Sequence, residues 1–406
     1  MILLASFKIH KHKINFNSLF NSYIIIFNLK LRVKLRVNQA ESDIYRKLQQ
    51  HLDTLPIGYP ATESGVEIRI LKFLFSPEEA EIALNMRFIP EPIKNIYRRV
   101  KKFGINLEQL EELLEIMFIK GAIRRVALRI ENGTDVILYQ NSPLAVGMFE
   151  YQVTRITKEF FEDFEQYMEE AFRDEFTSTK INQLRTIPVE KSISPNHNVA
   201  NYDELRNIFE DAKEIAVSPC ICHKGNQLLN KSCNSMSERC FTVNGSALNA
   251  VNRGYGHLIT KDEAFSIIEQ AQGEGLVIQP GNSKQPSYIC CCCSCCDLLT
   301  NLKKIDRPWE LITSNYYAEV DSVLCIGCET CIERCIMDAI QITDNVAIIE
   351  ELLCIGCGNC VVTCPEKAIN LQQKETESIP PETTQDLFLN IMSKRAELRR
   401  KDKGIE

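Results

Sequence analysis

The sequence predicts an α+β protein built from several domains, and three observations lead to this prediction. The chain has 406 residues, which is enough for two or three hydrophobic cores. Its N-terminal part carries helix signals followed by one hairpin signal, whereas its C-terminal part repeats one cysteine spacing. Between them lies a second group of cysteines. We therefore expect a winged-helix-like N-terminal domain, a cysteine-rich α-helical central domain and a C-terminal domain that carries the repeated cysteine motif.

Residues 1–40 differ in composition from the rest of the chain, because they contain seven Lys or Arg and no Asp or Glu. The apolar run Tyr23–Phe27 is far too short to span a bilayer, so we expect no membrane span. Lysines at positions 8, 11 and 13 also break the pattern of a signal peptide. A basic amphipathic anchor is one interpretation. We prefer a disordered extension, or a start codon placed too far upstream.

Residues 41–140 begin with helix signals. Ser76 precedes Pro77 and stands three residues before Glu79, which is the pattern of an N-capped helix with a capping box. Apolar periodicity predicts two further helices. Gly104 ends the first of them, and Asn106 caps the second. These helices are predicted over residues 93–103 and 107–120.

Two β-forming segments, 123–130 and 136–139, flank the hairpin dipeptide Asn132-Gly133. Helices followed by a hairpin indicate a winged-helix-like domain, for which DNA binding is the obvious function. The helix at the recognition position, however, carries carboxylates that oppose docking to phosphates: Glu108, Glu111, Glu112 and Glu115. Together with the formal net charge of −7, this favours a packing or partner-docking role over nucleic-acid binding. Basic pairs keep DNA binding open as the weaker alternative: Arg98-Arg99, Lys101-Lys102 and Arg124-Arg125.

Residues 141–201 are predicted to form a helical connector. Its main element is an acidic, aromatic-rich helix over 158–176, whose aromatic side chains indicate a core or a helix-pairing face. The stretch 182–201 lacks periodicity and contains two prolines, so we expect a linker or an edge strand there.

The central domain, 202–307, holds ten cysteines. If Cys220 and Cys222 lie in an extended segment they face the same side and can offer two thiolates to one metal. The run Cys290–Cys296 contains six cysteines, which cannot all be packing residues because successive side chains point in different directions. The candidate ligands of a further metal site are Cys220, Cys222, Cys233, Cys240, Cys290, Cys292, Cys293, Cys295 and Cys296.

Near the C-terminus the spacing C-x2-C-x2-C-x3-C occurs twice. Three thiolates separated by two residues each can surround one face of an iron–sulfur cubane, and the fourth points out of that loop, as in two-cluster ferredoxins. We therefore predict one [4Fe–4S] cluster on Cys325, Cys328, Cys331 and Cys364, and a second on Cys335, Cys354, Cys357 and Cys360. Structural zinc is a weaker alternative, because zinc motifs pair C-x2-C units at longer separations. Such clusters need a reducing environment, so we expect a cytoplasmic protein of an anaerobe.

The segment 318–372 resembles the bacterial two-[4Fe–4S] ferredoxins, and the resemblance implies a domain of two βαβ halves, followed by a charged C-terminal tail or helix over 373–406. The residues that carry it, besides the cysteines, are Ile326-Gly327, Ile355-Gly356, Ala339-Ile340, Ala368-Ile369 and Pro365. Ile336 departs from the pattern, since proline is usual there, and the turn after Cys335 is less rigidly preset.

The central domain is similar to uncharacterised ferredoxin-containing proteins of anaerobic bacteria and archaea, a resemblance that brings no established substrate. The matching pieces are Cys220-Ile221-Cys222, Cys233, Cys240, Gly254-Tyr255-Gly256, Gly275-Leu276-Val277 and Ile289–Cys296. Asp297 stands where a further cysteine is expected, and Cys291 is an extra one.

For the central cysteines we favour a metal site, either a third iron–sulfur cluster or a structural zinc. We prefer the cluster, because the neighbouring domain is already predicted to bind iron–sulfur clusters. Buried cysteines without a ligand and a redox-active thiol pair are the alternatives. His223 follows Cys222 directly and could be a ligand, although a lone histidine in that position more often makes a surface contact or supports a ligand.

Taken together, these signals predict an iron–sulfur electron-transfer protein that exchanges electrons with a redox partner protein. We expect an electron carrier or a redox subunit of an oxidoreductase rather than a stand-alone enzyme. Two other functions stay open: a redox-sensing regulator that uses the winged-helix-like domain, and a reductase with its substrate at the central cysteines.

Overall fold

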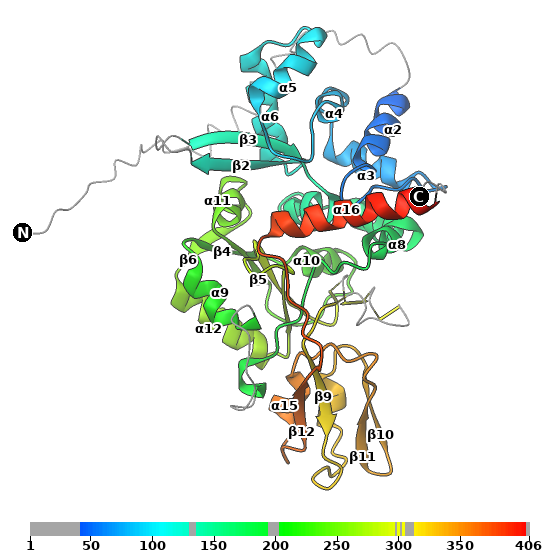
Figure 1. The fold of residues 1–406 in the computed structure, drawn as a ribbon, viewed down its shortest axis with the longest axis vertical. Helices are drawn as coiled ribbons and strands as arrows, with labels where there is room; N and C mark the ends of the chain where they lie inside the picture. Colours follow the sequence, from blue (N-terminus) through cyan, green and yellow to red (C-terminus); the bar gives the residue numbers. More distant parts are fainter. Residues whose placement is uncertain are drawn as a thin grey trace, which may run out of the picture.

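The computed structural model describes residues 41–129, 135–193, 203–296, 299–300, 303–304 and 312–402. Three regions follow one another along the long axis of the molecule (Figure 1). Helices with a small sheet lie at one end, a larger sheet lies in the middle, and short strand pairs lie at the other end. The predictions for residues 1–40, for the Asn132-Gly133 turn and for residues 194–201 fall outside the described residues.

The first region contains five helices and a three-stranded antiparallel sheet of order β1-β3-β2. The helices are α2 (Glu41–Leu52), α3 (Val66–Leu74), α4 (Pro77–Leu84), α5 (Ile93–Val100, continued by a 3-10 turn Lys101–Phe103) and α6 (Leu107–Ile119). The strands are β1 (Glu91–Pro92), β2 (Ile123–Arg129) and β3 (Asp135–Asn141). This order of helices and strands is the one expected of a winged-helix-like domain, an assignment that stays a prediction.

The residues predicted to begin and end the helices of this region do so in the structure. Ser76 accepts a hydrogen bond from the Glu79 backbone, and the Glu79 side chain accepts one from the Ser76 backbone, so the capping box is confirmed. Asn106 caps α6 in the same way, and Gly104 ends the preceding turn with a φ of 82°. Strands β2 and β3 pair in antiparallel register, as in the predicted hairpin.

The predicted aromatic helix begins as α7 (Lys158–Tyr167) and continues through a π-helical turn (Met168–Phe172) into α8 (Arg173–Thr177). Its aromatic side chains are buried in the same core as α2–α6. The C-terminal helix α16 (Thr384–Asp402) joins this core through Leu387, Phe388 and Ile391, and Arg395 forms ion pairs with Asp53 and Glu175. The end of the chain thus returns to its first region (Figure 1).

The middle region contains a five-stranded antiparallel sheet of order β6-β4-β5-β8-β7, so the expectation of an α-helical central domain is wrong. Its strands are β4 (Ile215–Pro219), β5 (Glu238–Val243), β6 (His257–Ile259), β7 (Val277–Pro280) and β8 (Tyr288–Cys292). The helices described beside it are α9 (Leu205–Asp211), α10 (Ile221–Leu228), α11 (Gly245–Asn252) and α12 (Lys261–Gly273). The central domain is a sheet because the first half of the cysteine run, Cys290–Cys292, forms part of a strand, β8, that pairs with β5 on one side and β7 on the other. Side chains along this strand alternate between the two faces of the sheet.

The C-terminal region repeats the order strand, helix, strand. Its elements are β9 (Tyr316–Val320), α14 (Thr330–Arg334), β10 (Ile340–Thr343), β11 (Val346–Ile349), α15 (Asn359–Thr363) and β12 (Ile369–Gln373). Antiparallel pairing joins β10 with β11 and β9 with β12, which makes this segment ferredoxin-like. Within the described ranges, no helix combines the length and apolarity that a bilayer span requires.

Candidate metal centres

Two cysteine-lined cavities lie in the C-terminal region. The first is lined by Cys325, Cys328, Cys331 and Cys364 among other residues. The second is lined by Cys335, Cys354, Cys357 and Cys360 among other residues. Each cavity therefore receives three cysteines from one ladder and the fourth from the other ladder.

Backbone groups around both cavities are directed at sulfur atoms. The amide of Ala347 donates to Cys325 Sγ at 3.3 Å, and the amides of Ala339 and Ala368 donate to Cys335 and Cys364 at 3.3 and 3.2 Å. Such N–H···S hydrogen bonds favour the thiolate form, which is the form that ligates iron. The donor set and its hydrogen bonds therefore fit an iron–sulfur cluster in each cavity.

The two cavities differ in their surroundings. Cys328 at the first cavity is exposed, and a hydrogen bond from Thr330 lowers its pKa. The second cavity is also lined by Val277 of the central sheet, and burial raises the pKa of Cys357 to about 12. The first site thus faces the surface, and the second faces the central region.

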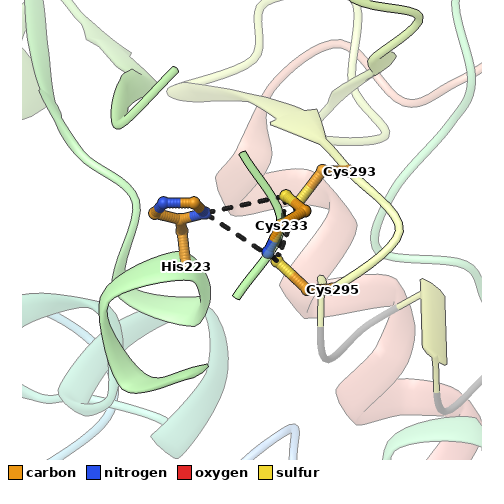
Figure 2. Close-up of side chains that lie close together, drawn as sticks. All are labelled: His223, Cys233, Cys293 and Cys295. Carbon is orange, nitrogen blue, oxygen red and sulfur yellow. Dashed lines mark hydrogen bonds between the residues drawn. The ribbon is translucent and has the colours of Figure 1, made fainter. Parts of the chain in front are cut away.

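The central cysteines divide into two groups, the first of which we call the Cys3His group: His223, Cys233, Cys293 and Cys295 (Figure 2). Their four candidate ligand atoms all lie within 4.8 Å of one another. The sulfur of Cys295 is 3.2 Å from that of Cys293 and 3.3 Å from that of Cys233. The Nδ1 atom of His223 is 3.8 Å from the sulfurs of both Cys233 and Cys295.

The second group, which we call the six-thiol ring, consists of Cys220, Cys222, Cys240, Cys290, Cys292 and Cys296. Neighbouring thiols shift one another's pKa, which places them side by side in the closed order Cys220, Cys240, Cys290, Cys292, Cys296, Cys222 and back to Cys220. Hydrogen bonds from Cys240 and Cys292 lower the pKa of Cys290 to about 6. The ring therefore contains groups prepared to be thiolates.

Strand geometry explains much of this ring. Cys240 of β5 and Cys290 of β8 are direct cross-strand partners, and Cys292 follows two residues later on the same face. Cys291 points to the other face, lies in the apolar core and belongs to neither group. Cys220 and Cys222 are not in an extended segment as expected, because Cys220 is the N-cap of α10, but their thiols still meet.

The two groups are neighbours, because at three places one residue belongs to one group and the next residue to the other. These pairs are Cys222 and His223, Cys292 and Cys293, and Cys295 and Cys296. Arg239 connects them. Its guanidinium is fully buried, donates to Cys293 Sγ at 2.9 Å and to Ser235 Oγ, and contacts the Cys220 thiol. A buried cation that contacts sulfur favours thiolates over neutral thiols in both groups.

An open hollow lies beside the Cys3His group. Cys233, Ser235 and Cys293 form one part of its wall, and Arg334 and Ile336, which flank Cys335, form another. The hollow thus extends from the central cysteines to the C-terminal domain.

The nine cysteines that the sequence offered as ligands of one site lie in two groups instead. For His223 the sequence left a ligand role open and favoured a surface or supporting contact; the side chain is buried and directs its Nδ1 at two sulfurs. Its position directly after Cys222 was the one sequence signal for this placement.

Comparison with known families identifies one segment. A family model described as a 4Fe-4S dicluster domain matches residues 324–369, a range that includes all eight cysteines of the two ladders. Neither the curated proteins nor the solved structures give a match to the chain. The dicluster domain and the many cysteines support iron–sulfur electron transfer.

Proposed function

We propose that the chain is an electron-transfer protein that holds two [4Fe–4S] clusters in its C-terminal domain. Cys325, Cys328, Cys331 and Cys364 would ligate the first cluster, and Cys335, Cys354, Cys357 and Cys360 the second. The observation that carries this proposal is the pair of cavities, each lined by three cysteines of one ladder and one of the other. When bound, each cluster supplies reversible one-electron transfer.

The surroundings of the two sites suggest a direction through the molecule. Apolar side chains are exposed next to the first cavity, including Val323 and Ile326, and they offer a contact surface to a redox partner protein. The second cavity is lined in part by Val277 of the central sheet, and Ile355 of its loop is buried. Electrons would thus enter or leave at the first site and pass inward to the second.

A third iron–sulfur centre on the six-thiol ring extends this proposal. Cysteine sulfurs alone form this ring, and such a soft donor set suits iron–sulfur chemistry. Val277 of β7 lines the second cavity and is the cross-strand partner of Cys292, so a single strand separates the ring from the second site. The chain would therefore carry a row of three centres.

A second candidate function is a reductase, and the open hollow favours it. The hollow reaches both the Cys3His group and the residues beside Cys335, so a small polar substrate there would lie next to a cluster ligand. Saturable binding of such a molecule, abolished by an Arg334→Glu substitution that leaves iron content unchanged, would support the reductase over a plain carrier.

The regulator alternative is weakened by the surface of α6. Glu108, Glu111 and Glu112 are exposed, whereas Glu115 is half-buried and paired with Arg125 at 2.7 Å. This pair removes one basic side chain from those that could contact phosphate. Fluorescence anisotropy with mixed DNA fragments at low salt, with oxidised and reduced protein, should show no salt-sensitive binding. Sub-micromolar binding would promote the regulator.

Iron and sulfide analysis of anaerobically purified full-length protein tests the main proposal. Two cubanes require about eight irons per chain, and a third cubane raises the number to about twelve. Electron paramagnetic resonance of the reduced protein should show the signals of interacting [4Fe–4S] clusters. An iron content below about four per chain, or reduced protein without such signals, would refute the proposal.

A further inference from the structure

We propose that His223, Cys233, Cys293 and Cys295 bind one zinc ion, and that this ion is separate from the iron–sulfur centres. The inference rests on the geometry of the Cys3His group and does not depend on the electron-transfer proposal. One histidine and three cysteines form a ligand set typical of structural zinc.

The distances fit a single tetrahedral ion. With Zn–S bonds of about 2.3 Å, two sulfurs of one tetrahedron lie about 3.8 Å apart, and a sulfur and a nitrogen lie slightly closer. The sulfur of Cys295 lies 3.2 and 3.3 Å from those of Cys293 and Cys233, and Nδ1 of His223 lies 3.8 Å from the sulfurs of Cys233 and Cys295. In a cubane each thiolate binds a different iron, which holds the sulfurs farther apart. The compact arrangement in Figure 2 therefore fits one metal ion and not a cluster.

Hydrogen bonds hold the ligands in position. The side-chain amide of Gln227 lies 3.1 Å from His223 Nε2, so it can fix the ring while Nδ1 faces the sulfurs. Asn226 donates to the carbonyl oxygen of Cys295 at 3.0 Å and thereby ties α10 to the loop after β8. The Cys233 amide lies 3.5 Å from Cys295 Sγ, to which it donates. Supporting contacts of this kind orient the ligands of metal sites.

The charges balance when zinc is bound. Three thiolates and Zn²⁺ give one net negative charge, and the Arg239 guanidinium, which donates to Cys293 Sγ, compensates it. Arg239 is fully buried, and an uncompensated charge at that depth would be costly. A zinc thiolate centre thus explains why an arginine is buried between the cysteines.

Four protein ligands leave no open coordination position, so the ion has a structural role. It would join α10, the loop before β5 and the loop after β8, which carry the four ligands. Each of Cys222, Cys292 and Cys296 is the chain neighbour of a zinc ligand. The ion would therefore also fix half of the six-thiol ring.

Metal analysis of full-length protein tests the inference with a matched pair of variants. Cys233→Ala removes a proposed ligand, and Cys291→Ala removes a cysteine that lies in the apolar core and in neither group. We expect about one zinc per chain in the parent protein and in Cys291→Ala, and at least about a ten-fold loss in Cys233→Ala. Iron is counted in the same samples, so a failure of the cluster proposal would be seen separately.

Two measurements keep the test decisive if Cys233→Ala does not fold. His223→Cys preserves a four-ligand zinc set and should retain zinc, whereas His223→Ala should lose it. Parent protein prepared with Co²⁺ in place of zinc should show the visible bands of a tetrahedral thiolate site. Absence of zinc from the parent protein, retention of zinc in Cys233→Ala, equal zinc loss in Cys291→Ala, or an octahedral cobalt spectrum would overturn the inference.

Discussion

The two halves of the C-terminal domain carry the same cysteine spacing but occupy different environments. Ile326 and Ile355 stand at the same place in the two ladders, yet Ile326 is 62% exposed and Ile355 only 2%. The second loop lies against the central region, where Asn359 donates to the carbonyl oxygen of Gly275 at 2.7 Å. In the first half the comparable contact comes from the far end of the ladder, where Arg334 donates to the carbonyl oxygen of Gly273 at 2.8 Å.

This difference teaches that the spacing sets which cysteines meet, whereas tertiary contacts set how each site is used. Solvent exposure and hydrogen bonds to sulfur tune the reduction potential of a cluster. Two sites of equal ligand set can therefore differ in potential and in access, as an outer and an inner site of an electron path would. The following predictions test that contrast.

The largest effect is expected from Gly356→Ala. Gly356 has a φ of +64°, and a Cβ atom there would lie 2.2 Å from the carbonyl oxygen of Tyr316. The strand behind it would have to move, so we expect a loss of stability of at least about 3 kcal/mol, measured by denaturant unfolding.

Two other glycines serve as controls for this substitution. Gly65 has a similar φ of +69° with nothing within 4 Å, so Gly65→Ala should cost only about 1 kcal/mol. Gly327→Ala meets Asn345 O at 2.6 Å in an exposed hairpin turn, and its cost should fall between the two. Equal losses of stability for Gly327→Ala and Gly356→Ala would mean that the second loop is no more constrained than the first.

The next effect concerns the crossing of ligands between the ladders. Cys335 lines the second cavity, although it belongs to the first ladder, so Cys335→Ser should damage the cluster on Cys354, Cys357 and Cys360. Electron paramagnetic resonance of the reduced variant should lose one signal, and iron should fall by up to about four per chain.

The reciprocal variant Cys364→Ser should remove the other signal, because Cys364 lines the first cavity. Loss of the same signal in both variants would contradict the crossed assignment. Retention of the signal from Cys354, Cys357 and Cys360 in Cys335→Ser would contradict it as well.

A smaller effect should be visible in the parent protein. Because Cys328 is exposed and Cys357 and Cys360 lie deeper, an iron chelator or brief exposure to air should attack the first cluster several-fold faster. A time course of the two resonance signals measures this order. Simultaneous loss of both signals would show that the chelator or oxygen reaches the two clusters equally well, despite the exposure of the first loop.

The sequence allowed the local features of this fold to be predicted, because their causes are local. The capping residues Ser76 and Asn106 act on amides three residues away, and the ladder cysteines are spaced within single loops. The central sheet was missed because its pairing is long-range: Cys240 meets Cys290 only after β5 and β8 come together. His223 likewise meets Cys293 and Cys295 from about seventy positions away, a separation over which sequence gives no periodic signal.

The smallest effect is expected from Asn359→Ala. Asn359 is buried, and its side chain donates to Gly275 O, so the variant should lose about 1–2 kcal/mol by leaving that carbonyl unpaired. Thr330 occupies the matching place in the first ladder, where its hydroxyl lies 3.5 Å from the sulfur of the exposed Cys328. Thr330→Ala should therefore cost less than about 0.5 kcal/mol. If denaturant unfolding gives equal costs for the two variants, the contact between the second loop and the central region contributes nothing, and the inner site would not be held there by this hydrogen bond.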